Sequence, residues 1–189
     1  MEKVKAHIVS WLKAYSEKSN TDGFVIGVSG GIDSAVSSIL CAETNKKVVL
    51  LNMPIRQSAN EFARAERHIE DLKNRYSNVS SHELNLSPVF ESFEKVMPFD
   101  IESNGLSLAN SRARLRMMTL YAVGQANNLL VAGTGNKVED FGIGFYTKYG
   151  DGGVDLSPIA DLNKTEVFAL AKTLNVIQGI QNAAPTDGL

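Results

Sequence analysis

The chain alternates between two kinds of apolar pattern. Short apolar, often β-branched runs are typical of buried strands, and they occur at 23–28, 47–53 and 129–135, with a weaker example at 80–86. Helical spacing of apolar residues predicts helices over about 29–42, 58–76, 87–97, 109–127 and 163–174. Because strands and helices alternate, we predict an α/β fold, a doubly wound parallel sheet with helices on both faces.

Several helices carry recognisable start signals and apolar faces. Ser58 followed by Glu61 is a capping-box pattern, and Asn163 with Glu166 is expected to cap the last long helix. A further amphipathic helix opens the chain. The residues expected on apolar faces are Val4, Ile8, Trp11, Leu12 and Tyr15 in this first helix, Phe62, Ile69, Leu72 and Tyr76 after Ser58, and Val167, Leu170, Ala171 and Leu174 after Asn163. The glycine-rich stretch 141–159 is predicted as a loop, and loops of this length often carry function.

Length and composition narrow the class of protein. The chain has 189 residues, of which 43% are hydrophobic and 21% charged, so a single globular domain over 1–189 is expected. The net charge of −2 argues against charge-driven binding to nucleic acid or to an anionic membrane. Cys41 is the only cysteine, which fits a reducing compartment. The N-terminus has neither a signal-peptide nor a membrane-span pattern, so we expect a cytoplasmic protein.

The strongest chemical signal is SGGIDSA, Ser29 to Ala35, between a predicted strand and helix. Gly30 and Gly31 allow a tight turn and a close approach of the backbone to a ligand. The free N–H groups at the start of the helix then form an anion site. Asp33 would repel phosphates unless a Mg²⁺ ion bridged the two, as hard cations do. We therefore predict a site for a phosphate chain and Mg²⁺.

Simpler interpretations compete with this prediction. Two glycines also make ordinary turns, and an aspartate in a first helical turn is favoured by the helix dipole alone. The loop is not a Walker A loop, because the Gly-Lys-Ser/Thr ending is missing, and it lacks the GxGxxG dinucleotide fingerprint. The whole heptad after a buried strand is more specific than the glycines alone.

The SGGIDSA heptad resembles the loop of the PP-loop family, the N-type ATP pyrophosphatases. The resemblance implies an adenine-nucleotide alpha-hydrolase-like fold and a loop that holds the pyrophosphate end of ATP. It does not choose among NAD synthetases, GMP synthetases, asparagine and argininosuccinate synthetases, and tRNA thiolation enzymes. Thiolation enzymes generally use cysteines and RNA-binding domains, whereas Cys41 is expected to be a buried core thiol. A non-catalytic nucleotide-binding module is a third alternative.

The second half of the sequence resembles the ammonia-dependent NAD synthetases. The resemblance rests on ANSRARLRM (109–117), GTGNKVED (133–140), FYTKYGDGGVDLSPIADLNKTEV (145–167) and PTDGL (185–189). It implies that ATP adenylates the carboxylate of deamido-NAD and that ammonia displaces AMP, which gives NAD and pyrophosphate. It also implies a homodimer that acts on small molecules, with no nucleic acid or membrane partner. Too few residues precede the first strand for the glutaminase domain of the glutamine-dependent branch, so free ammonia, or ammonia from a separate partner, is expected.

Site residues follow from this resemblance position by position. ATP contacts are expected from Gly27, Val28, Ser29, Gly30, Gly31, Ile32, Asp33, Ser34, Met53, Thr134, Lys164 and Thr186. Mg²⁺ ligands are expected to be Asp33 and Glu139, and contacts to deamido-NAD are expected from Arg114, Lys148 and Asp155. The expected catalytic residues are Asp33, Lys164 and Asp151.

Two local features qualify the match. Arg112, Arg114 and Arg116 are spaced so that Arg114 points away from the other two, and we expect one arginine to face the anionic ligand and two to face solvent. Family members usually continue for several tens of residues beyond PTDGL, with a His-Lys pair that contacts deamido-NAD. This sequence stops at Leu189, so those contacts map onto no residue here and a truncated form is expected.

Overall fold

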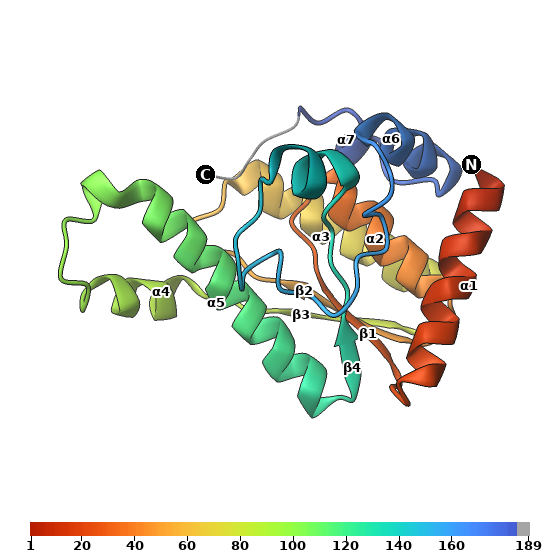
Figure 1. Cartoon of the computed structure of the whole chain (residues 1–189), viewed down its shortest axis with the longest axis horizontal. Coiled ribbons are helices and arrows are strands. Elements are labelled where there is room, and N and C mark those ends of the chain that lie inside the picture. The colour runs from red at the N-terminus through yellow and green to blue at the C-terminus, as the bar shows by residue number, and fades with distance from the viewer. Residues whose placement is uncertain (185–189) are drawn as a thin grey trace.

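The computed structural model describes residues 1–184 and is built around one four-stranded sheet (Figure 1). The strands lie in the order β3–β2–β1–β4, and each neighbouring pair is parallel. Their bounds are β1 (Gly23–Gly27), β2 (Lys47–Asn52), β3 (Val79–Glu83) and β4 (Leu129–Val131). All four carboxyl ends therefore lie at one edge of the sheet, as the predicted α/β fold requires.

Helices cover both faces of the sheet, which confirms the doubly wound arrangement. One face packs against α1 (Glu2–Lys18), α2 (Ile32–Ala42), α3 (Ala59–Arg75), α6 (Lys164–Thr173) and α7 (Gln178–Gln181). The other face packs against α4 (Ser87–Glu94) and α5 (Gly105–Ala126). Side chains alternate along each strand, so Phe24 and Ile26 join the first core and Val25 joins the second.

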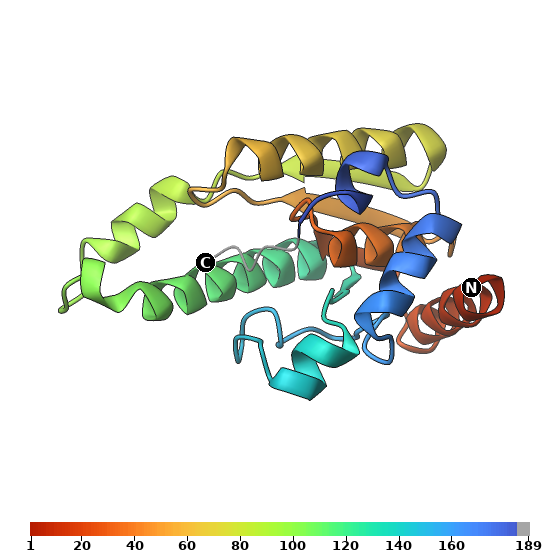
Figure 2. The same ribbon diagram turned by 90° about the horizontal axis from the view of Figure 1, so that it is seen from above.

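The strand order creates a switch point beside β1. From β1 the chain crosses to β2 and on to β3, and it later returns through α5 to β4 on the opposite side of β1. Ligands in open parallel sheets bind at such reversals, beyond the carboxyl ends of the strands. In the second view, α6 lies beside α2 near this edge, and α4 with the first turns of α5 extends away from the sheet (Figure 2).

The helix start signals and most predicted core faces are confirmed. Glu61 donates its backbone N–H to Ser58 Oγ at 3.3 Å, and Glu166 Oε2 accepts from the Asn163 N–H at 2.8 Å. The predicted apolar face of α6 is buried, as is the Cys41 thiol. None of the helices within residues 1–184 is long and apolar enough to cross a membrane.

The predicted apolar face of α1 is partly wrong. Ile8 and Leu12 are buried, but Trp11 is 41% exposed and Tyr15 is 40% exposed. The buried stripe instead continues to Ser16, one turn beyond Leu12. The Ser16 hydroxyl donates to the Thr21 carbonyl at 2.9 Å. A hydroxyl with a backbone partner can be buried without a large penalty, so the polar residue takes the inward position.

Segment boundaries also differ from the prediction. Strand β4 ends at Val131, and the chain beyond it pairs with a later segment, because Ala132 bridges Leu156 and the Gly133 N–H donates to the Leu156 carbonyl at 2.8 Å. Helix α5 begins at Gly105, after the 3₁₀ turn η1 (Glu102–Asn104). The prediction missed α7 and the π-helical segment η2 (Lys137–Ile143). Single π-helical turns lack a distinctive apolar period and are frequent at functional sites.

A buried histidine ties α2 to α3. His68 Nε2 lies 2.9 Å from Ser38 Oγ, and Ser38 donates its own hydrogen to the Ala35 carbonyl. Nε2 therefore carries the ring hydrogen, and Nδ1 has no partner among the described residues. Burial lowers the pKa of His68 from 6.5 to about 4. The ring is thus a neutral link between two helices.

This link predicts an acid-sensitive contribution to stability. Because the folded pKa is the lower one, only the unfolded chain binds this proton between pH 6.5 and 4, so stability falls as the pH falls through that window. The full effect is about 3 kcal/mol. We expect His68→Gln to flatten the pH dependence of the free energy of unfolding, measured by urea denaturation. The matched change His82→Gln, at an exposed histidine, should leave that slope as it is in wild type.

Candidate nucleotide site at the carboxyl edge of the sheet

The loop after β1 is a tight turn that requires glycine. Gly30 has a φ of +84°, and a Cβ atom at this position would lie 2.6 Å from the Glu61 carbonyl oxygen. Only glycine fits both the backbone conformation and this close approach. Ser29 Oγ lies 3.2 Å from Ser34 Oγ and accepts from the Gly31 N–H at 3.2 Å. The turn is thereby closed by its own hydroxyl groups.

Helix α2 starts from this turn without a side-chain cap. Its N-cap residue is Gly31, and no side chain within residues 1–184 bonds to the first N–H groups. The N-terminus of an uncapped helix of 11 residues favours an anion through these N–H groups and the helix dipole. Val28 and Ile32 point into the core, so these two positions can offer only their backbone to a ligand. Gly27 lies beside the buried Met53 side chain.

Three charged residues far apart in sequence meet beside the turn. Lys164 Nζ lies 2.5 Å from Asp33 Oδ2 and 2.9 Å from Glu139 Oε1, so one ammonium bridges two carboxylates. Asp33 belongs to the first turn of α2, Glu139 to η2 and Lys164 to the start of α6. The structure therefore brings together the predicted metal ligands and the predicted catalytic lysine.

Asn136 is a buried residue that holds this cluster in place and that sequence reasoning missed. Its Nδ2 donates to Asp33 Oδ1 at 3.0 Å, and its Oδ1 accepts from the N–H groups of Val138 and Glu139 at 3.1 Å each. It thus links the start of α2 to the start of η2. The signal available in the sequence was an asparagine three positions before Glu139, a residue type that caps helix starts through its side-chain oxygen.

The charges of this cluster perturb one another. Burial alone would lower the pKa of Lys164, but hydrogen bonds to Asp33 and Glu139 raise it above its ordinary value. Burial, and then the negative charges of Asp151, Glu139 and Asp33, raise the pKa of Asp140 to about 6. The carboxylates of Asp33, Glu139, Asp140 and Asp151 thus lie close enough to raise the pKa of one of them, and the Lys164 ammonium bridges two of the four.

The two carboxylates of the cluster fit a hard cation. Asp33 and Glu139 converge on a single cationic atom, and oxygen donors of this kind are what Mg²⁺ prefers. Within the described chain, no three histidine, cysteine, aspartate or glutamate side chains are grouped to hold a metal by themselves. Phosphate oxygens or waters would have to complete the coordination, which is the usual arrangement for Mg²⁺ at nucleotides.

The residues expected to contact the second substrate lie on the α5 side of the site. Arg114 is exposed and donates Nε to the Lys148 carbonyl at 3.0 Å, and Lys148 Nζ lies 5.1 Å from the centre of the Tyr149 ring. Asp151 Oδ1 accepts from the Thr147 N–H at 2.9 Å, which closes the glycine-rich turn. The structure thus brings Arg114 and Lys148 together.

Asp155 is fixed beneath the end of β4. Its Oδ2 accepts from the Val131 N–H at 2.8 Å and its Oδ1 from the Tyr121 hydroxyl at 2.9 Å. Burial, followed by the hydrogen bond to Asp155, raises the pKa of Tyr121 to about 12. Each oxygen of the Asp155 carboxylate keeps a lone pair that can accept from a ligand, while these two hydrogen bonds fix the position of the side chain.

The expectation that two of the three arginines face solvent is wrong. Arg116 donates Nε to the Met53 carbonyl at 3.1 Å, and burial followed by the charge of Arg112 lowers its pKa. Arg112 lies 5.9 Å from the centre of the Phe90 ring. Arg114 is the exposed member of the set. Helix α5 therefore directs a partly buried positive charge toward the carboxyl end of β2.

Of the two threonines predicted to contact ATP, the structure describes Thr134 but not Thr186. Thr134 is half-buried just beyond β4, at the same edge as the SGGIDSA turn. Thr186 lies outside the described residues.

Two donors from the α3 region that the sequence did not single out, Gln57 and Arg64, contact the turn through its carbonyl groups.

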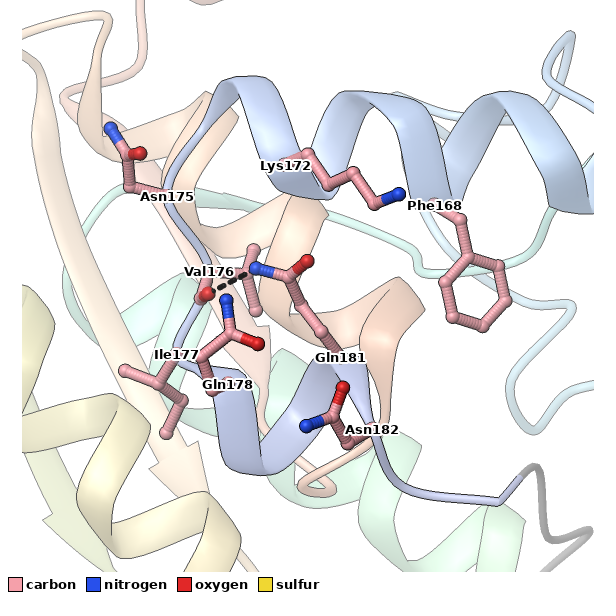
Figure 3. A pocket seen from close by; sticks show the side chains of 8 residues that line it. All are labelled: Phe168, Lys172, Asn175, Val176, Ile177, Gln178, Gln181 and Asn182. Atoms are coloured by element: carbon pink, nitrogen blue, oxygen red, sulfur yellow. Dashed lines mark hydrogen bonds between the residues drawn. The ribbon is translucent and has the colours of Figure 1, made fainter.

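A pocket of about 790 Å³ lies away from this cluster, between α6 and α7 (Figure 3). Four of its eight lining residues carry amide side chains, and Gln181 Nε2 donates to the Val176 carbonyl at 2.6 Å. None of the loop, carboxylate or arginine residues described above lines it. The candidate site is therefore the sheet edge and not this pocket.

A parallel α/β sheet with a glycine turn, an uncapped helix start and a carboxylate–lysine cluster defines a nucleotide-binding protein of the PP-loop class. The profile of the NAD synthase family matches residues 4–189, and the chain belongs to this family. The NH₃-dependent NAD⁺ synthetase of Alkaliphilus metalliredigens is 40% identical over 187 residues, which cover 96% of this chain and 75% of that protein. The corresponding synthetase of Mesoplasma florum is 38% identical, over 97% of this chain and 73% of that protein.

Solved structures agree with this assignment. NMN synthetase from Francisella tularensis superimposes with a TM-score of 0.91 at 35% identity, over 99% of this chain and 76% of that one. The NH₃-dependent NAD synthetase from Campylobacter jejuni gives a TM-score of 0.86 at 33% identity, over 95% of this chain and 76% of that one. The chain thus spans about three quarters of the length of these relatives.

The bridging lysine predicts a linked change in stability and cation binding. Lys164→Met leaves Asp33 and Glu139 facing each other without the ammonium, so the free energy of unfolding should fall by about 1–3 kcal/mol at low salt. Mg²⁺ should then stabilise this variant more than wild type, because the cation takes the place of the ammonium. Thermal melts with and without Mg²⁺ measure both effects. Lys172→Met on the same helix is the control, and equal Mg²⁺ effects in all three proteins would refute the prediction.

Proposed function

We propose that this chain catalyses the ATP-dependent amidation of deamido-NAD with ammonia, to give NAD, AMP and pyrophosphate. The observation that carries the proposal is the cluster of Asp33, Glu139 and Lys164 beside the glycine turn, which combines an anion site with cation ligands. Relatives named NH₃-dependent NAD⁺ synthetases support ammonia as the nitrogen donor. The same similarity disfavours RNA thiolation and a non-catalytic nucleotide module.

In this proposal the nucleotide lies along the carboxyl edge of the sheet. The pyrophosphate end of ATP binds the Ser29–Ser34 turn and the start of α2, and the adenine lies near Met53. Thr134, and Thr186 outside the described residues, are kept as proposed ATP contacts. Asp33 and Glu139 would hold Mg²⁺, which neutralises phosphate charge when bound. Lys164, released from its carboxylate partners, would stabilise the charge that develops on the phosphates in the transition state.

The second substrate is proposed to bind on the α5 side. Arg114 and Lys148 would pair with its phosphates, and Asp155 would accept a hydrogen bond from it. Its carboxylate attacks the α-phosphate of ATP, the bond from that phosphorus to pyrophosphate breaks, and a mixed anhydride with AMP forms. Ammonia then attacks the carbonyl carbon, and AMP leaves with the former carboxylate oxygen. Asp151 is the proposed acceptor of the proton that ammonia loses.

The domain organisation, the oligomeric state and the cellular location are each proposed from a different observation. Residues 1–189 form one synthetase domain, since both cores share a single sheet. The apolar side chains exposed along α4 and the first turns of α5 are proposed to be covered by a second copy in a homodimer; they include Val89, Phe93, Val96 and Leu106. A cytoplasmic location is proposed because the single cysteine is a buried thiol.

The first test concerns the products of the reaction. We expect ATP that is consumed with deamido-NAD, Mg²⁺ and ammonium to appear as AMP and pyrophosphate in equal amounts, with one NAD formed for each AMP. One ¹⁸O atom of a labelled substrate carboxylate should be recovered in AMP. Asp33→Asn should lose turnover while the protein still folds, because the side chain lies at a helix start and not in the core. ADP as the product, or NAD formed with unlabelled AMP, would exclude the adenylate route.

A second candidate substrate is nicotinate mononucleotide, whose amidation would give NMN. The observation that favours it is the similarity to the NMN synthetase from Francisella tularensis, with a TM-score of 0.91 at 35% identity. Both substrates present the same pyridine carboxylate, so the chemistry of the site serves either one. They differ in the adenylate half, which only the dinucleotide can place against the protein.

Competition between the two substrates decides which reaction the site favours. We expect a higher kcat/KM for deamido-NAD than for nicotinate mononucleotide when both are supplied together. We also expect Arg114→Ala to raise the KM for deamido-NAD about ten- to a hundredfold, the loss of one charge-assisted hydrogen bond, while the KM for ATP stays unchanged. A reversed preference of the wild-type enzyme would select the second candidate.

A further inference from the structure

Two consecutive carbonyl groups of the glycine turn are held from the α3 side. Gln57 Nε2 donates to the Ser29 carbonyl at 2.9 Å, and Arg64 Nε donates to the Gly30 carbonyl at 3.3 Å. Gln57 immediately precedes the N-cap of α3, and Arg64 lies in the second turn of that helix. We call these two donors with the two carbonyl groups the carbonyl clamp.

The carbonyl clamp sets the direction of the N–H groups that face a ligand. In a trans peptide the C=O and the following N–H point in opposite directions. Holding the Ser29 and Gly30 carbonyl groups toward α3 therefore turns the N–H groups of Gly30 and Gly31 away from α3. The Gly31 N–H donates to Ser29 Oγ within the turn, so the Gly30 N–H is the one of the two that remains for a ligand among the described residues. The backbone of Gly30 also lies against Glu61, where a Cβ atom would be only 2.6 Å from the carbonyl oxygen. Helix α3 thus acts as a template for the turn.

Arg64 also brings a positive charge to this turn. The residue is half-buried, and only its Nε has a hydrogen-bond partner within residues 1–184, where no carboxylate forms an ion pair with it. A partly buried guanidinium with unused donors favours an anion nearby. The anion that the turn is built to hold is a phosphate chain.

The helix that carries Arg64 is itself fixed against the helix that carries Asp33. His68 lies one turn after Arg64, on the same face of α3, and its ring contacts Ser38 of α2 at 2.9 Å. The turn is therefore held between two helices that are joined by a buried hydrogen bond. Such a rigid support reduces the reorganisation needed when the ligand binds.

We propose that Arg64 and Gln57 are positioning residues for the pyrophosphate end of ATP. They orient the N–H groups of the turn, and the charge of Arg64 adds to the attraction for the phosphates. This inference rests on the proposed function, since it concerns the same site. It assigns the affinity for pyrophosphate to α3 as well as to the turn and the start of α2.

The test measures pyrophosphate and ATP binding directly, without requiring turnover. Calorimetric titration of the folded chain with Mg²⁺-pyrophosphate and with Mg²⁺-ATP gives a Kd for each. We expect Arg64→Ala to weaken both by about tenfold, the loss of one charge-assisted interaction. Arg64→Lys, which keeps the charge, should recover part of that loss, and the KM for deamido-NAD should stay within about twofold of wild type.

Arg67→Ala is the matched control, because Arg67 lies on the same helix but is exposed and donates to the Ala63 carbonyl of its own helix. It removes the same charge and should leave both Kd values unchanged. If Arg64→Ala does not fold, Arg64→Gln and Gln57→Leu carry the test, with weaker pyrophosphate binding expected in each. Wild-type affinity in the folded Arg64 and Gln57 variants, or an equal loss in Arg67→Ala, would overturn the positioning role. Wild-type protein that binds neither ATP nor pyrophosphate would instead refute the proposed function.

Discussion

The bridge from Lys164 to Asp33 and Glu139 depends on the order of the strands, and much of the candidate site depends on that bridge. Because β4 returns beside β1, the segment that follows β4 reaches the start of α2, where Asn136 donates to Asp33 at 3.0 Å. Helix α6 packs on α2 and delivers Lys164 to the same point. Three segments that are distant in sequence thus meet at the edge where parallel sheets bind ligands. Without the reversal at β1, the carboxylates and the ammonium would belong to separate surfaces.

The glycine turn and the carboxylates around Lys164 are stabilised in different ways. The turn must present N–H groups to an anion, so its carbonyl groups point away and are bonded by Gln57 and Arg64. The carboxylates must remain close together despite their repulsion, which raises the pKa of Asp140 to about 6 after the larger effect of burial. In the structure, Lys164 balances part of this repulsion. A bound cation would do the same and would release the ammonium for the substrate.

The sequence was sufficient for the fold class because the strands are continuous apolar runs between helices with clear periodicity. It also singled out Asp33 from the SGGIDSA turn itself, and Glu139 and Lys164 through a family resemblance, and the structure shows that the three meet. Local spacing could not show that Ser16 is buried while Trp11 is exposed, since the sheet selects which stripe of α1 faces inward. The π-helical segment η2 and the contacts of Asn136, Gln57 and Arg64 depend on long-range packing. No local period or propensity encodes them.

The arrangement of charges suggests why this edge suits a polyphosphate that carries a cation. Arg64 and Arg116 approach from α3 and α5, and each donates to a backbone carbonyl, with no carboxylate partner in the part of the chain that the structure describes. Asp33 and Glu139 instead meet at Lys164, between the start of α2 and η2. A polyphosphate bound alone would satisfy the arginines but would be repelled by Asp33, and a cation bound alone would satisfy only the carboxylates. A phosphate chain with its cation meets both demands at once, so each partner should strengthen the binding of the other.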